Sequence, residues 1–251
     1  MTTATAVPTR TLHARAVGVA RRRFLRVLLL AGLWFWTVWF LLVLGLPIVV
    51  SRWGGVATGL SYDTAGSPAR WPAFAVGIIA TGALLRIHLA AGGTRRALVE
   101  GVAGGALVGG VAYGVLGVVL PLLEQQVYAE VGLPWRGPGG AFALDSAARI
   151  VASVVAGTLL IVTYALVGTG VLAGYRRWGA LRGTLAIVPL LVPCALVDAA
   201  TRTGVFGIWL RDAPVTSVLD AAGSLAGALL AAALAAVVAH RLLRDVRTRP
   251  A

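Results

Sequence analysis

The sequence contains no lysine, so all 22 of its basic residues are arginine. This absence excludes a phosphate-binding loop of the G-x-x-x-x-G-K-[ST] type, whose lysine reaches the β- and γ-phosphates of a nucleotide. It also excludes catalysis through a lysine Schiff base. The single cysteine, Cys194, excludes an intramolecular disulfide and a metal cluster built from cysteines. The chain therefore lacks the standard means of hydrolysing ATP by itself.

Charged residues of either sign are scarce, at 12% of 251 residues, whereas soluble domains carry about 25%. Hydrophobic residues make up 59%. Such a chain suits lipid, in which backbone groups must bond internally and helices are favoured. We predict an all-α membrane protein in contact with the lipid bilayer. The net charge of +13 does not indicate a nucleic-acid partner, because the arginines lie between apolar stretches instead of in one basic domain.

Six apolar stretches predict six transmembrane helices, since about 20 helical residues cross the hydrocarbon core. They cover 27–50, 71–91, 101–123, 146–175, 184–200 and 215–239. The fifth is short and contains Pro189 and Pro193, which favour a bent or broken helix. The predicted organisation is an N-terminal segment (1–26), a six-helix transmembrane domain (27–240) and a tail (241–251).

The distribution of arginine predicts the orientation in the membrane. Sixteen arginines fall in segments on the same side as the N-terminus, and six, including Arg70, fall on the other side. Cytoplasmic segments carry the excess of basic residues, so both termini are expected in the cytoplasm. The basic stretch 10–25 predicts an interfacial helix; a disordered tail is the alternative. The arginine-only, alanine-rich usage is typical of a GC-rich bacterial genome, which places the protein in a bacterial plasma membrane.

Glycines recur four residues apart, which lets helices approach closely in lipid. We interpret this spacing as packing inside one bundle, with a dimer face as the alternative. The spaced pairs and triplet are Gly101, Gly105 and Gly109; Gly110 and Gly114; Gly170 and Gly174; and Gly223 and Gly227.

Ionisable residues within membrane segments are costly and are therefore functional candidates. Asp220 lies five residues inside the sixth stretch. There it either contacts a substrate or gates the outer mouth, or it pairs with an arginine near the outer surface. Asp198 is the second candidate for an intramembrane polar site. Its spacing of four from Arg202 predicts a local helical pair, as does that of Asp145 and Arg149. The segment 201–214 is predicted either to dip into the outer leaflet or to form an interfacial loop.

The three histidines, His13, His88 and His240, are far apart in the sequence and show no metal-ligand spacing. No hydrolase signature is present. We therefore predict no catalytic residue, no metal and no cofactor.

The loop between the second and third stretches reads His88-Leu-Ala-Ala-Gly-Gly-Thr-Arg-Arg, followed by Gly101. Its G-x-T-R-R signature, from Gly92 to Arg96, and the six-span architecture with a basic N-terminal helix resemble the permease subunits of ABC-2-type transporters, particularly small actinobacterial ones. The resemblance implies a coupling helix within 86–100 that docks on a separate cytoplasmic ATPase subunit.

The residues to which the resemblance assigns this coupling role are Gly92, Thr94, Arg95, Arg96 and Glu100. It further implies a second permease subunit, in a homodimer or heterodimer, and export of a substrate. Three alternatives stand beside it: the loop is only a positive anchor, the protein is a non-transporting scaffold or assembly factor, or it is an intramembrane enzyme. The arginine-rich loop favours transport over a scaffold, and the lack of a reactive constellation disfavours an enzyme.

Overall fold

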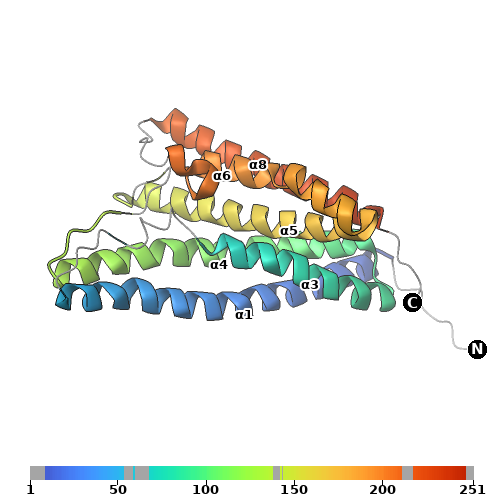
Figure 1. Cartoon of the computed structure of the whole chain (residues 1–251). Coiled ribbons are helices and arrows are strands. Elements are labelled where there is room, and N and C mark those ends of the chain that lie inside the picture. The colour runs from blue at the N-terminus through green and yellow to red at the C-terminus, as the bar shows by residue number, and fades with distance from the viewer. Residues whose placement is uncertain are drawn as a thin grey trace, which may run out of the picture.

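The computed structural model describes residues 9–53, 59, 68–137, 142, 144–210 and 217–246, and within these it contains helices and no strand. Five helical segments are long and apolar enough to cross a membrane, which confirms an all-α membrane protein. Figure 1 shows the helices lying lengthwise along one another. In chain order they are α1 (Thr9–Arg52), α3 (Arg70–Ala90), α4 (Arg95–Glu130), α5 (Ala147–Leu190), α6 (Val192–Thr201), α7 (Gly204–Gly207), the 3-10 helix η1 (Ile208–Leu210) and α8 (Val218–Arg244).

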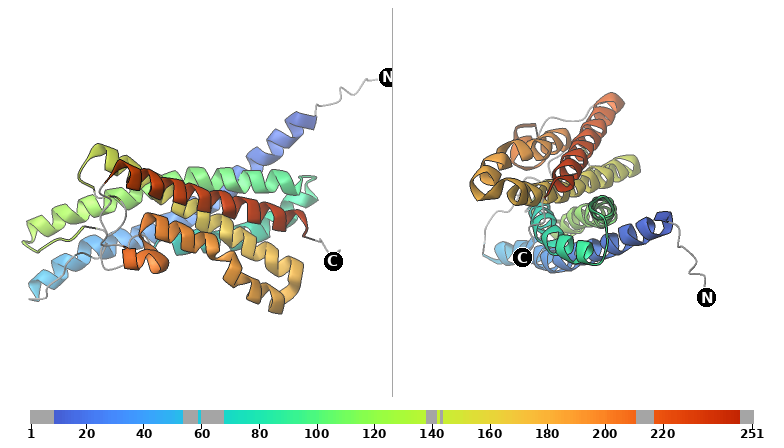
Figure 2. Two further views of the ribbon diagram at one scale, coloured as in Figure 1. Left: turned by 90° about the horizontal axis from the view of Figure 1, so that it is seen from above. Right: turned by 90° about the vertical axis from the view of Figure 1, so that its right-hand side faces the viewer.

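Helix α5 contains a reversal of direction at Gly179. This residue has φ 79° and ψ −176°, a conformation that glycine adopts without the steric penalty of a Cβ. The chain then returns along α5, and the hydroxyls of Tyr175 and Thr184 lie 3.0 Å apart across the reversal. Figures 1 and 2 show the rest of α5 and α6 running back beside the first part of α5. The predicted prolines sit in this returning segment, and Leu191 separates α5 from α6.

Helix α1 is continuous over 44 residues, so no break separates the predicted interfacial helix from the first predicted span. Its N-terminal half packs on α4 instead of standing alone at an interface. Gly101, Gly105 and Gly109 of α4 face successive turns of α1, at Ala20, Phe24 and Leu28 in turn.

Most of the remaining predicted glycines also lie against neighbouring helices or side chains, but Gly223 has no described atom within 4 Å of an added Cβ. Gly110 and Gly114 face Thr158 and Val154 of α5, and Gly227 faces Ala200 of α6. The interpretation as packing inside one bundle is therefore confirmed for these glycines.

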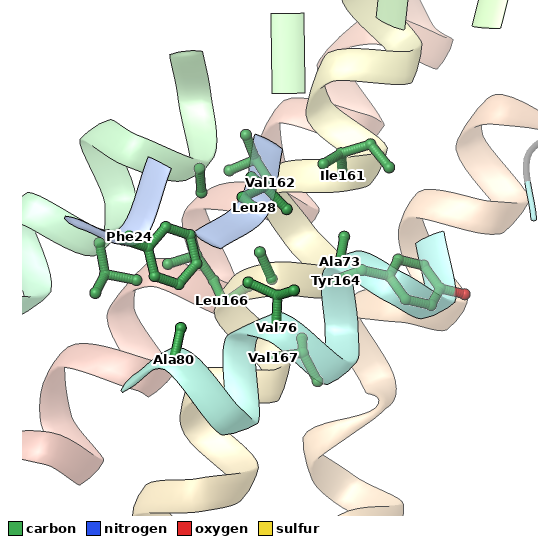
Figure 3. Packing of buried hydrophobic residues seen from close by; sticks show 14 of the residues in the cluster. Phe24, Leu28, Ala73, Val76, Ala80, Ile161, Val162, Tyr164, Leu166 and Val167 are labelled. Carbon is green, nitrogen blue, oxygen red and sulfur yellow. The ribbon is translucent and has the colours of Figure 1, made fainter. Parts of the chain in front are cut away.

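Helix α3 starts about halfway along the first part of α5. Arg70, its first residue, contacts Tyr164, which lies midway between Ala147 and Gly179. The two helices run in the same direction and approach closely, with Gly77 against the carbonyl of Ala165. Figure 3 shows the core that these helices share, in which α1, α3 and α5 each contribute side chains such as Phe24, Val76 and Leu166.

Four segments meet at one end of the bundle. The start of α1 meets the start of α4 through His13 and Glu100, and the start of α4 meets the end of α8 through Arg95 and the carbonyl of Arg244. Arg177, just before the reversal in α5, pairs with Asp245 after α8 at 2.6 Å. We call this the arginine-rich end.

Candidate functional sites

A buried ion pair joins α3 to α6. The Arg70 guanidinium donates to the Asp198 carboxylate at 2.7 Å, and their side chains are 3% and 0% exposed. Helix α3 otherwise packs mainly on α5 and α1, and α6 mainly on α8 and α5, so the ion pair supplies a direct link between α3 and α6. Burying a charge is costly unless it is paired and hydrogen-bonded, so each residue requires the other in this position.

The hydroxyl of Tyr164 completes this site from α5. It donates to the carboxylate of Asp198, lying 3.2 and 3.1 Å from the two oxygens. Its ring also faces the Arg70 guanidinium at 5.7 Å, and Trp71 packs edge-on against the ring. Three helices are thus fixed to one another by a single polar cluster, which we call the Arg70–Asp198–Tyr164 cluster.

The chain closes over this cluster at Gly204, where φ is 68°. A Cβ at Gly204 would overlap both the Arg70 guanidinium and the Asp198 carboxylate. Both the positive φ and the lack of room for a Cβ therefore require glycine at this position. Residues 204–210 form the short helices α7 and η1 next to the cluster, within the segment predicted to dip or to lie at the surface.

Of the two predicted pairs between a carboxylate and the arginine four residues later, one is corrected and one is confirmed. Asp198 forms its ion pair with Arg70 and not with Arg202 as predicted, because Arg202 leaves the helix in a left-handed conformation, with φ 55°, at the end of α6. Arg70 itself is buried in the bundle and is not an outer-loop residue. The prediction for Asp145 and Arg149 is confirmed, since they pair at 2.6 Å.

Asp220 lies at the beginning of α8 and is exposed, not five residues inside a helix as predicted. Ser217 is the N-cap residue and its hydroxyl accepts from the Asp220 amide at 3.1 Å. A carboxylate in the first turn suits the positive end of the helix dipole. Of the two predicted intramembrane candidates, only Asp198 is therefore buried.

The loop of the G-x-T-R-R signature is a tight turn between α3 and α4. Gly92 has φ 79°, and the amides of Gly92 and Gly93 donate to the carbonyls of Leu89 and His88 at 3.0 and 2.8 Å. These are the two hydrogen bonds of a glycine-ended helix C-terminus. Thr94 then caps α4, because its hydroxyl accepts from the amide of Ala97 at 3.1 Å.

The turn leaves no residues for a separate coupling helix, since α3 ends at Ala90 and α4 begins at Arg95. Gly92 and Thr94 have local structural roles as caps. The remaining signature residues, Arg95 and Arg96, occupy the first turn of α4. A docking surface in this region would therefore consist of that first turn and not of a helix within 86–100.

Glu100 binds two partners at the arginine-rich end. Its carboxylate accepts from Arg96 at 2.7 Å and contacts the His13 ring at 2.9 Å, so it joins α4 to α1. The Arg96 side chain remains 74% exposed, which leaves it accessible from outside the bundle.

A cavity of about 490 Å³ lies beside these residues, between the start of α4 and the end of α8. Arg95 extends along it and donates to the Arg244 carbonyl at 3.5 Å, whereas its buried Nε has no hydrogen-bond partner. The cavity is lined by six residues: Arg95, Arg96, Val99, Glu100, His240 and Arg244.

Neither Arg70 nor Tyr164 was predicted as a site residue. Arg70 precedes an apolar stretch and resembles a loop arginine, and Tyr164 is one aromatic residue in a long apolar run. The only sequence signal was the cost of an acidic residue in an apolar helix, which pointed to Asp198 but not to its partners. Within the described residues, no group of three or more histidine, cysteine or acidic side chains is positioned to hold a metal ion.

Comparison of the chain with protein-family models, curated proteins and solved structures finds no match. The resemblance to ABC-2 permeases therefore rests on the loop and the architecture alone.

Proposed function

We propose that the protein is the permease subunit of an ABC transporter, driven by a separate cytoplasmic ATPase and exporting a substrate across a bacterial plasma membrane. In this proposal the chain crosses the membrane six times and functions in a homodimer or heterodimer. Both termini and the arginine-rich end lie in the cytoplasm.

The reversal at Gly179 supports six crossings. The helical segment Ala147–Thr201 has 55 residues, more than twice the roughly 20 that one crossing needs. The parts before and after Gly179 lie side by side, as two separate crossings would require. An even number of crossings agrees with α1 beginning, and α8 ending, at the same end of the bundle.

The observation that carries the transport proposal is the position of Arg95 and Arg96. Both lie in the first turn of α4 at the arginine-rich end, and Arg96 is largely exposed. Guanidinium groups form planar, two-pronged contacts with carboxylates, which suits the docking of an acidic surface on an ATPase. Because α4 contacts α1, α5 and α8 along its length, movement of its first turn reaches much of the bundle.

The test is a charge reversal of the first turn. The Arg95→Glu/Arg96→Glu double variant is co-expressed with a candidate ATPase subunit from the same organism, and co-purification and stimulated ATP hydrolysis are measured. Like charges across an interface cost several kcal/mol, so both signals are expected to be lost. Arg182→Glu is the matched control, since Arg182 is an exposed arginine after the reversal and is not in α4.

Membrane insertion is measured in parallel, because the double variant also weakens the basic signal for orientation. A correctly inserted double variant that still recruits and stimulates the ATPase would refute the proposed coupling role.

A non-transporting scaffold is the second candidate. Arg70 and Asp198 neutralise one another in a closed site, and glycine contacts fix the helices tightly, as suits a static bundle. A scaffold would remain assembled and functional when the ATPase gene is deleted, whereas a permease would lose its activity.

A further inference from the structure

We propose that the cavity between α4 and α8 binds a phosphate group, supplied by the headgroup of an anionic phospholipid of the inner leaflet. The cavity shares Arg95 and Arg96 with the proposed docking surface and adds Arg244 from the end of α8. The assignment to the inner leaflet rests on the proposed orientation, and lipid binding is measured without the ATPase, so the two proposals can fail separately.

The charge of the cavity favours an anion. Its lining has three arginines, Arg95, Arg96 and Arg244, against a single carboxylate. That carboxylate, Glu100, already contacts Arg96 and His13 with its two oxygens, at 2.7 and 2.9 Å. Its negative charge is therefore compensated before any ligand enters.

Among the described residues, neighbouring acidic groups do not cancel the remaining charge. Asp245 follows Arg244 directly, but its carboxylate is paired with Arg177 of α5 at 2.6 Å. The lining of the cavity thus keeps an excess of positive charge from Arg95 and Arg244.

Arg95 supplies a hydrogen-bond donor that has no acceptor within the part of the chain that the structure describes. Its Nε is buried and has no partner, whereas one terminal nitrogen donates weakly, at 3.5 Å, to the Arg244 carbonyl. A buried N–H without an acceptor costs free energy, which a bound phosphate oxygen would recover. Arginine forks also match the geometry of phosphate oxygens.

In the proposed orientation, the location selects a lipid as the source of the phosphate. Basic pockets between transmembrane helices on the cytoplasmic side accommodate the headgroups of anionic lipids. The cavity lies between the start of α4 and the end of α8, both of which are apolar helices. Its volume is sufficient for a headgroup.

The experiment measures lipid binding by the purified full-length protein in neutral detergent. Phosphatidylglycerol and phosphatidylcholine are titrated separately, and the bound fraction is followed by native mass spectrometry and by the shift in Tm. The wild type is expected to bind phosphatidylglycerol in preference to phosphatidylcholine. The Arg95→Gln/Arg244→Gln variant is expected to bind phosphatidylglycerol on the order of tenfold more weakly.

Arg241→Gln is the matched control. Arg241 is an exposed arginine in the same turn of α8 as Arg244 but does not line the cavity. Its removal changes net charge by the same amount as a single site variant, so it should leave the preference unchanged. Arg244→Gln alone, at an exposed position, provides the comparison if the double variant does not fold.

A separate titration with inorganic phosphate, without lipid, distinguishes the source. Stabilisation by inorganic phosphate equal to that by phosphatidylglycerol, and lost in the site variant, would retain the phosphate site but overturn the lipid source. Equal phosphatidylglycerol binding by the wild type and by a folded site variant would overturn the site itself, as would an equal loss in Arg241→Gln.

Discussion

Arg70 and Asp198 are 128 positions apart in the sequence and form a 2.7 Å ion pair in the interior of the bundle. The pair ties the first residue of α3 to the end of α6, where Tyr164 of α5 binds the same carboxylate. Because it lies halfway along α5, it fixes the relative depth of three helices at one point.

Removing one charge of this pair should destabilise the fold strongly. Asp198→Asn removes the carboxylate charge that pairs with the Arg70 guanidinium at 2.7 Å, and breaking a buried pair costs about 3–5 kcal/mol. We expect a large fall in the Tm of the purified protein in detergent. Tyr164→Phe removes a single hydrogen bond and should cost only about 1 kcal/mol.

The double variant Arg70→Met/Asp198→Leu provides the control for that prediction. It removes both charges together, so it should be more stable than Asp198→Asn. A double variant no more stable than Asp198→Asn would show that the pair is not the source of the loss.

The capping hydroxyl of Thr94 tests whether the turn between α3 and α4 contributes to stability. Thr94→Ala removes the N-cap of α4 and should cost about 1 kcal/mol of stability, whereas Thr94→Ser retains the capping hydroxyl and should cost much less. Thermal unfolding in detergent measures both. If Thr94→Ala unfolds like the wild type, the cap does not contribute to stability.

Gly101 tests the contact between α1 and α4. A Cβ there would lie 2.5 Å from that of Ala20 and 2.8 Å from the Val17 carbonyl oxygen, so Gly101→Val should separate the helices and cost about 2 kcal/mol. Gly117→Ala on the same helix is the control, because nothing lies within 4 Å of its added Cβ. Comparable losses of Tm in the two variants would contradict close packing at Gly101.

The proposed topology predicts the labelling of introduced cysteines. In a Cys194→Ala background, Trp53→Cys should react with a membrane-impermeant maleimide in intact cells, since Trp53 is 85% exposed at the far end of α1. Arg241→Cys, near the arginine-rich end, should react only after lysis. Reaction of Arg241→Cys in intact cells would place that end outside.

The purified chain should not hydrolyse ATP by itself, because it has no lysine for a phosphate-binding loop. Phosphate release is measured after size-exclusion chromatography. Hydrolysis that co-elutes with the protein and persists in preparations free of other ATPases would refute this prediction.

The sequence was sufficient to predict the class of fold, because long apolar stretches leave helices in lipid as the favoured structure. The spacing of glycines predicted the close contacts between helices, and Pro189 and Pro193 predicted the break between α5 and α6, but neither pattern predicted the reversal at Gly179. The sequence did not predict that α1 continues unbroken past residue 26. The arginines before that point suggested a surface helix, whereas contacts with Gly101 and Gly105 extend the packed part of α1.

The buried cluster was only partly predictable for a different reason. A spacing of four identifies helical neighbours, so it joined Asp198 to Arg202 in the sequence. The helix ends at Thr201, and tertiary packing brings Arg70 to the carboxylate. Partners that come from distant helices leave no signal in the spacing of a single sequence.

The matched turns of α1 and α4 have a mechanical consequence. The three glycines of α4 that are spaced four residues apart allow Ala20, Phe24 and Leu28 to pack against that helix. The Tyr113 hydroxyl also donates to the Leu28 carbonyl at 3.0 Å. The paired helices are therefore expected to tilt together as one stiff lever. At 1.5 Å per residue α1 is about 66 Å long, twice the thickness of the hydrocarbon core. A small displacement at one end of this lever would be delivered, with little loss, to the opposite face of the membrane.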